Sequence, residues 1–317
     1  MYLKKIVIGG VLILTLAIQI GCYGNNSQKN PDSSKDVNQK VTENSEINHD
    51  SKQEKGIMDE FNSLVDNRAG LNEIINFINE NILLVSKENA SAMVCRFEEV
   101  QENNLPELEK KYYADSIQEK LNDAYKPGYI IDINEIDSID DKELKDLLVK
   151  TRDVGFKVET AEGMFFPIIN YEFYKKYSSY VMEDIKEYID IMAVESGKAP
   201  ARDAALVIGW DEVLDRALIQ EKFINQYTES ERINDIRQLY EKYVRFALFG
   251  LNNTPLFNYD SLTMSDEAKS IYLEAVEKQE ESKLMEKLQG FIEILEKSNY
   301  RLTDEASEYR ETVLENM

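Results

Sequence analysis

GWDEVLDRALIQEKFINQY, residues 209–227, shows most clearly how this chain folds. Its apolar side chains recur every three or four residues, at Trp210, Val213, Leu214, Ala217, Leu218 and Ile224. That spacing puts them on one face of an α-helix. A second apolar stripe runs from Ile233 to Leu248 and ends at Gly250. Two amphipathic helices joined by a short turn predict a helical hairpin that buries a shared apolar face.

The same helical periodicity covers most of the chain after residue 55. Further helices are predicted at about 57–85, 89–102, 106–125, 140–153, 171–196, 264–278, 281–298 and 303–315. Pro106 is expected in the first turn of its helix, where a missing N–H costs little. Gly (13) and Pro (6) are scarce, which also favours helices over strands. The predicted fold class is mainly α, built from stacked helical hairpins.

One small β-hairpin is predicted within GFKVETAEGMFFPIINYEFY. Residues 156–160 alternate apolar and polar side chains, Glu162-Gly163 can form a turn, and residues 164–169 are again apolar. Residues 129–136 also alternate and could form a short strand. The segments 193–203 and 251–260 are expected to be loops.

EKFINQYTESERINDIRQLYEKYV, residues 221–244, resembles the turn between helices of tetratricopeptide-like repeats. In those repeats a helix with an aromatic end, a Tyr-x-x-Ser turn and an amphipathic helix recur. Only one such helix pair is clear here, and no period of about 34 residues is visible. The resemblance therefore implies stacked helical hairpins, without a named repeat family.

The N-terminus has the pattern of an export signal. Lys4 and Lys5 precede an apolar run at residues 6–20, which is short of the roughly 20 residues that a spanning helix needs. Small Gly21 then precedes Cys22, where the chain becomes polar.

This pattern resembles the lipobox of bacterial lipoproteins, which reads roughly Leu, a small or apolar residue, Gly or Ala, then Cys. Ile20 and Gly21 match it, and Gln19 stands where Leu is usual. The resemblance implies that residues 1–21 are a signal peptide, that Cys22 receives a diacylglyceryl group, and that the protein is anchored on the extracytoplasmic face of the cell membrane. A simple signal peptide and an uncleaved anchor are the alternatives.

Residues 22–55 are predicted to be a disordered tether, and residues 56–317 a mainly helical extracytoplasmic domain. The tether has almost no large apolar side chains, so it cannot bury enough surface to offset its ordering entropy. As a coil it would hold the domain on the order of 30 Å from the membrane. The only histidine, His49, lies in the tether.

Composition excludes several classes of function. The net charge of −23 repels polyanions, so no nucleic-acid partner is expected. A catalytic triad that needs histidine is excluded for residues 56–317, and no Walker, GxGxxG, CxxC or HExxH motif is present. No metal or cofactor is predicted. Cys95 lies among apolar residues and is expected to be a buried small side chain.

Three groups of residues are candidates for binding. Tyr171 and Tyr174 lie in an aromatic cluster, and on an α-helix they would project away from the stripe of Phe173, Tyr177 and Tyr180. Such aromatic surfaces suit contacts with sugars or proteins, although the cluster could instead pack the hairpins. The other candidates are Trp210 and the loop residues Asn252 and Asn253, where a structural turn is the alternative.

Two functional hypotheses follow. The first is a non-enzymatic binding or scaffold module that engages a protein or a cell-wall polymer. The alternative is a carboxylate-based hydrolase of an envelope glycan, with Trp210 stacking on the sugar and Asp211 or Glu212 as acid or base. A further resemblance covers about residues 155–260. This region is similar to uncharacterised lipoproteins of Gram-positive bacteria in the stretches FFPIINYEFYKKY, WDEVLDRAL and FGLNNTP, and the resemblance implies no activity.

Overall fold

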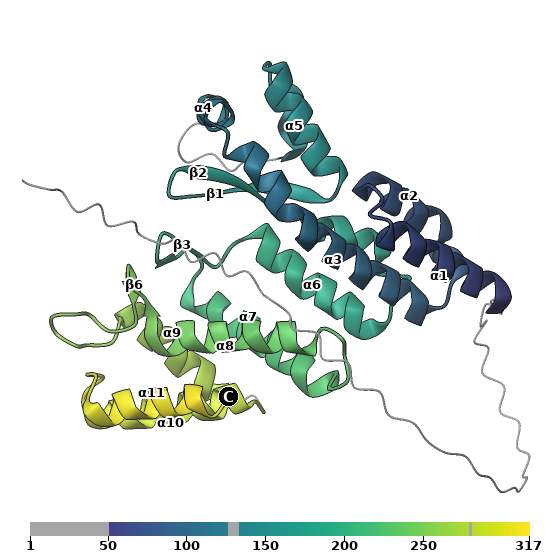
Figure 1. Cartoon of the computed structure of the whole chain (residues 1–317). Helices are drawn as coiled ribbons and strands as arrows, with labels where there is room; N and C mark the ends of the chain where they lie inside the picture. Colours follow the sequence, from purple (N-terminus) through teal and green to yellow (C-terminus); the bar gives the residue numbers. More distant parts are fainter. Residues whose placement is uncertain (1–50, 126–132, 279–280) are drawn as a thin grey trace, which may run out of the picture. The chain divides into compact units, whose positions relative to one another are not determined.

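The computed structural model describes residues 51–125, 133–278 and 281–317. The predictions for the signal peptide, for Cys22, for the tether up to residue 50 and for residues 129–132 lie outside the described residues. Over the described ranges the chain is mainly helical, as predicted (Figure 1). None of the helices described is both long and apolar enough to cross a membrane.

Long helices form most of the structure. They are α1 (Ser51–Asp66), α2 (Leu71–Asn81), α3 (Lys87–Tyr112), α4 (Asp115–Ala124), α5 (Lys142–Asp153), α6 (Glu183–Gly197), α7 (Trp210–Gln226), α8 (Ile233–Phe249), α9 (Asp266–Glu277), α10 (Lys283–Lys297) and α11 (Asp304–Glu315). Short 3-10 helices are η1 (Ile82–Leu84), η2 (Ile133–Ser138) and η3 (Tyr171–Tyr177).

The strands form two-stranded antiparallel sheets. They are β1 (Phe156–Ala161) with β2 (Met164–Ile169), β3 (Ala201–Arg202) with β4 (Ala205–Leu206), and β5 (Gly250–Leu251) with β6 (Thr254–Pro255). The first pair is the predicted hairpin, with Phe156 opposite Ile169 and Ala161 opposite Met164. β3 and β6 lie in the segments that were expected to be loops, whereas β4 and the start of β5 lie just outside them.

Three clusters of buried apolar side chains hold these elements together. The first cluster joins α1, α2 and α3 to η3 and α6. The second holds together the five helices α7, α8, α9, α10 and α11. The third packs α4 and α5 against the β1–β2 hairpin. Phe223 on α7 and Ile236 on α8 belong to the first cluster, so α7 and α8 contribute to two of them. This position places α7 beside α6, which it contacts.

Several element boundaries differ from the predictions. The helix expected at 57–85 is two helices separated by a turn in which Arg68 has a positive φ of 57°, and helix begins at Ser51, inside the expected tether. Residues 133–136 belong to the 3-10 helix η2 and not to a strand.

Pro106 lies inside α3 and not in the first turn of a new helix. A proline in a helix interior costs roughly 3 kcal/mol, and helix α3 nevertheless continues to Tyr112. Tyr112 is fully buried in the third cluster and its hydroxyl lies 2.7 Å from Thr151 Oγ1. The helix therefore continues through the proline and ends on a buried side chain.

Candidate functional site: a pocket between α6 and α7

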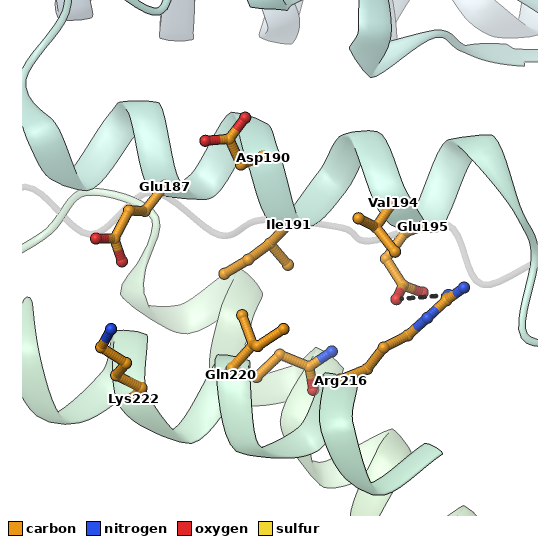
Figure 2. Close-up of a pocket in the computed structure, with 9 residues that line it drawn as sticks. Glu187, Asp190, Ile191, Val194, Glu195, Arg216, Gln220 and Lys222 are labelled. Carbon is orange, nitrogen blue, oxygen red and sulfur yellow. Dashed lines mark hydrogen bonds and ion pairs between the residues drawn. The ribbon is translucent and has the colours of Figure 1, made fainter. Parts of the chain in front are cut away.

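A cavity of about 270 Å³ opens between α6 and α7 (Figure 2). We call it the α6–α7 pocket; it is lined by Glu187, Asp190, Ile191, Val194, Glu195, Arg216, Ile219, Gln220 and Lys222. The first five residues are on α6 and the last four on α7. The two helices run in opposite directions, because the end of α6 at Glu195 lies next to Arg216 near the start of α7.

Aliphatic side chains form one part of this pocket. Ile191 is buried, whereas Val194 and Ile219 are 48% and 55% exposed although they line a cavity. Within the described residues both are among the few large apolar side chains that remain exposed. Exposed apolar surface beside a concave site is typical of binding sites.

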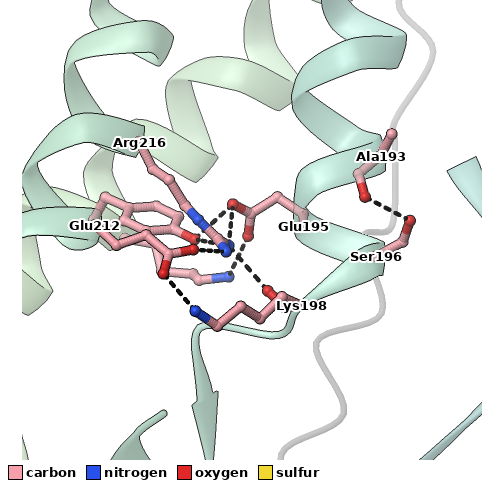
Figure 3. Close-up of polar contacts among 8 residues, drawn as sticks. Ala193, Glu195, Ser196, Lys198, Glu212 and Arg216 are labelled. Atoms are coloured by element: carbon pink, nitrogen blue, oxygen red, sulfur yellow. Dashed lines mark hydrogen bonds and ion pairs between the residues drawn. The ribbon is translucent and has the colours of Figure 1, made fainter. Parts of the chain in front are cut away.

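Arg216 closes one end of the pocket and belongs to a polar cluster (Figure 3). Its guanidinium is 3.1 Å from Glu195, donates at 3.0 Å to the hydroxyl of Tyr243 and at 3.0 Å to the carbonyl of Lys198, and pairs with Glu212 at 2.5 Å. The side chain of Arg216 is only 5% exposed. Its charge is therefore used inside the fold and not offered to a ligand.

Gln220 lies on the same wall and is almost completely buried. Its Oε1 atom accepts no hydrogen bond from any described residue. An unpaired buried amide oxygen costs about 1–3 kcal/mol, so a protein usually satisfies it with water or a bound group. Because Gln220 lines the cavity, a donor entering the pocket is in the right region to satisfy it.

Charged side chains form the opposite rim. Glu187 accepts a hydrogen bond of 3.0 Å from the hydroxyl of Tyr227, while Asp190 and Lys222 are exposed. Neither Asp190 nor Lys222 forms an ion pair with another residue of the described ranges. The pocket thus has an aliphatic centre, a neutralised end at Arg216 and a charged rim of Glu187, Asp190 and Lys222.

The structure places Tyr171 and Tyr174 in the core, at 7% and 1% exposure. Their hydroxyls donate to Glu98 and Gln101, respectively. The prediction that Tyr171 and Tyr174 form an exposed aromatic surface is therefore wrong. The reason is that η3 is a 3-10 helix, in which residues three apart share a face, so Tyr171, Tyr174 and Tyr177 all turn inward.

The buried tyrosines belong to a second polar cluster, around Glu98. Its carboxylate lies 2.9 Å from Arg232 and accepts hydrogen bonds from Tyr171 and, at 2.6 Å, from Tyr188. Burial raises the pKa of Glu98, while Arg232 and the two hydroxyls oppose this shift. The carboxylate oxygens of Glu98 are already bound by partners inside the protein, so the cluster is a structural element and not a ligand site.

Trp210, predicted as a candidate for sugar stacking, is 3% exposed and meets the ring of Tyr272 edge-on at 6.0 Å. It has no ring face free to stack on a sugar. Asp211 is exposed, and Glu212 is held by Lys198 at 2.6 Å and by Arg216. These two cations lower the pKa of Glu212, which opposes a role as a general acid near neutral pH.

Asn252 and Asn253 lie at the turn between β5 and β6 and are exposed. The backbone N–H of Asn253 donates to the carbonyl of Ala204 at 2.8 Å, and its side chain donates to the carbonyl of Asp203 at 2.6 Å. Asn253 therefore ties one hairpin to the next, as the alternative of a structural turn implied. The structure does not bring these two residues into the α6–α7 pocket.

Cys95 is buried, as expected for a small core side chain, and its thiol is free within the described residues. Burial raises the pKa of its thiol to about 12. Among the described residues, no group of three or more His, Cys, Asp or Glu side chains could hold a metal ion.

Sequence reasoning missed the α6–α7 pocket. Val194 and Ile219 are aliphatic residues on the polar face of amphipathic helices, and this is the one signal that was visible. That the two polar faces meet along a groove depends on how α6 packs on α7, which periodicity within each helix does not contain. Comparison of the chain with family models, with curated proteins and with solved structures found no match.

Proposed function

We propose that this protein is a lipid-anchored extracytoplasmic binding module, in which the α6–α7 pocket accepts an apolar side chain of a polypeptide partner. The observation that carries the proposal is the exposure of Val194 and Ile219 at the mouth of the cavity. An apolar group entering the pocket would cover both aliphatic side chains.

The size of the pocket supports a side chain as the ligand. Pockets for small molecules usually measure about 300–1,000 Å³, and the α6–α7 pocket, at about 270 Å³, lies just below that range. A cavity of this size suits one large aliphatic or aromatic side chain inserted from a partner surface. Hot spots of protein interfaces typically have this form, with one buried anchor surrounded by a polar rim.

The polar groups of the pocket support binding rather than catalysis. Glu195 is engaged by Arg216 and by the hydroxyl of Tyr243 at 2.5 Å. A general acid or base must be free to reach a substrate proton, and this carboxylate already has partners. The membrane anchor at Cys22 is supported by the N-terminal sequence pattern and would keep the module at the cell surface.

A capture experiment with the full chain tests the proposal. Ile219→Asp places a charge at the mouth of the pocket, and we expect partner capture from solubilised envelope proteins to fall at least about 30-fold, since a central anchor is worth about 2 kcal/mol or more. Leu83→Asp is the matched control, because Leu83 is similarly exposed, at 60%, but lies in η1. A photoreactive residue at position 219 should crosslink to the same partner.

Two results would count against this function. Equal capture by the Ile219 and Leu83 variants, with unchanged thermal unfolding, would exclude the pocket as the binding site. Mass spectrometry of the mature protein without a diacylglyceryl adduct on Cys22 would exclude the lipid anchor.

A further inference from the structure

A second cavity, of about 480 Å³, lies at the other end of the same pair of helices. It is formed where α6 begins and α7 ends, with Asp184, Tyr227 and Glu229 among its lining residues. The hydrogen bond from Tyr227 to Glu187 connects the lining of this cavity with that of the α6–α7 pocket.

The two cavities open along one face of the helix pair. On α6, lining residues occur at 183, 187, 190 and 194, with spacings of four, three and four. On α7 they occur at 219, 222 and 226, with spacings of three and four. Residues at this spacing follow a single stripe along a helix. The two cavities therefore lie along the same side of the helix pair, and we call them together the α6–α7 groove.

The ends of this groove differ in chemistry. Val194 and Ile219 make the end near the start of α7 aliphatic. The other end and the middle carry more carboxylates than cations. Asp184, Asp190 and Glu229 form no ion pair within the described part of the chain, whereas of the two lysines in the lining Lys87 is paired with Glu183 and Lys222 is exposed. A partner that fits both ends must therefore combine an apolar anchor with positive charge.

We infer that the occupant of the α6–α7 groove is a basic amphipathic helix of a partner protein. Its apolar side chain enters at Val194 and Ile219, and its Lys or Arg side chains lie over Asp190 and Asp184. This inference rests on the proposed function and specifies the partner. Two antiparallel helices form a groove into which a third helix packs, and helices are commonly recognised in this way.

The groove also sets the spacing on the partner. Val194 and Asp184 are ten residues apart on α6, which corresponds to about 15 Å at about 1.5 Å per residue. On a helical partner, the anchor and the basic group are therefore about ten residues apart. On an extended partner, at about 3.3 Å per residue, the same distance takes only four or five residues.

Synthetic peptides and the full chain test this spacing by fluorescence anisotropy. The first probe is an alanine-based helix of about 20 residues, with one Phe and a group of three Lys about ten positions away, made in both chain directions. The second probe has the same composition with the Lys group four positions from the Phe. A third replaces the Phe by Ala. We expect the first probe to bind about 10-fold more tightly than the second, and the third to lose binding.

Charge substitutions in the protein provide the second arm. Asp184→Asn with Asp190→Asn should weaken the first probe about 10-fold and leave the second unchanged. Asp266→Asn with Asp304→Asn is the matched control, because it removes the same charge from α9 and α11, outside the groove. Raising the salt concentration should weaken the first probe more than the second, since exposed charge pairs are screened.

The outcomes separate the two proposals. If the probes with the two spacings bind equally and binding still requires Ile219, the pocket is the site and the inference about a basic helix is wrong. If the four-residue spacing binds more tightly, the partner is extended and the inference is likewise wrong. If Phe-dependent binding is absent with every probe and in the control variants, both proposals fail.

Discussion

The carboxylate of Glu98 shows how single residues hold this structure together. It lies on α3 and is reached by Arg232, just before α8, and by tyrosines from η3 and α6. Arg232 also donates at 3.0 Å to the carbonyl of Cys95. Because both charges are almost fully buried, each depends on the other for compensation.

Removing the cation of this pair should strongly destabilise the protein. Arg232→Met leaves a buried carboxylate without its cation, and we expect a loss of about 3–5 kcal/mol in the free energy of unfolding. The measurement is urea denaturation followed by circular dichroism. Arg237→Met is the control, because Arg237 is an exposed arginine in the first turns of α8, and its change should stay within about 0.5 kcal/mol.

The same variant should show a defined pH dependence. Burial raises the pKa of Glu98 in the folded protein, and loss of Arg232 raises it further. A carboxyl group whose folded pKa is raised contributes most to stability below its unfolded pKa, and this contribution is lost as pH rises. The stability difference between wild type and Arg232→Met should therefore be smallest near about pH 4 and grow towards about pH 7. A pH-independent difference would contradict a buried ionised pair.

At the scale of elements, the end of α8 depends on a glycine. Gly250 has a positive φ of 70°, and a Cβ there would lie 2.4 Å from the carbonyl oxygen of Thr254 and 2.6 Å from the amide of Leu256. Both atoms are backbone, so the β5–β6 turn would have to shift. Gly250→Ala should cost the backbone strain of about 1–2 kcal/mol and a further 1–3 kcal/mol or so for the clash.

Gly163→Ala is the comparison that isolates the clash. Gly163 has a similar φ of 75° in the β1–β2 turn, but a Cβ there would meet nothing within 4 Å. Thermal unfolding of the two variants should therefore show the larger loss for Gly250→Ala. Equal losses would mean that the β5–β6 turn relaxes without cost.

Elements with a long apolar period could be predicted from sequence, whereas contacts between elements could not. The stripe that includes Val213, Leu214 and Ala217 predicted α7, and the Glu162-Gly163 turn predicted the β1–β2 hairpin, and both are confirmed. Tyr171 and Tyr174 were placed outside because an α-helical period of 3.6 was assumed where the chain forms a 3-10 helix. The difference of about 0.6 residue per turn decides which rings face the core.

The candidate site illustrates a second limit. Periodicity identifies the buried face of each helix, but the α6–α7 pocket is made by the faces that periodicity assigns to solvent. Ile219 and Val194 interrupt otherwise polar faces, and only the packing of α6 on α7 shows that they line one cavity. A pair of isolated aliphatic residues on polar faces is thus a useful signal once the packing of the two helices is known.

At the scale of the whole molecule, net charge opposes the folded state. The chain carries 60 Asp and Glu against 37 Lys and Arg, for a net charge of −23. The ion pairs of the described residues are mostly exposed, and such pairs contribute about 0–1 kcal/mol each. A large excess of one sign destabilises a compact state through self-repulsion, and the excess carboxylates have no cation to pair with.

Added salt should therefore stabilise the protein at neutral pH. Salt screens both the repulsion between like charges and the attraction within exposed ion pairs. Because the chain has a large excess of negative charge, screening removes more repulsion than attraction. Raising NaCl from about 10 mM to about 300 mM at pH 7 should add about 1 kcal/mol and raise Tm by about 2–4 °C. Near the isoelectric point of about 4.6 the excess charge is absent, so the same change should leave Tm nearly constant or lower it. A fall in Tm with salt at pH 7 would show instead that the surface ion pairs dominate the electrostatic free energy of folding.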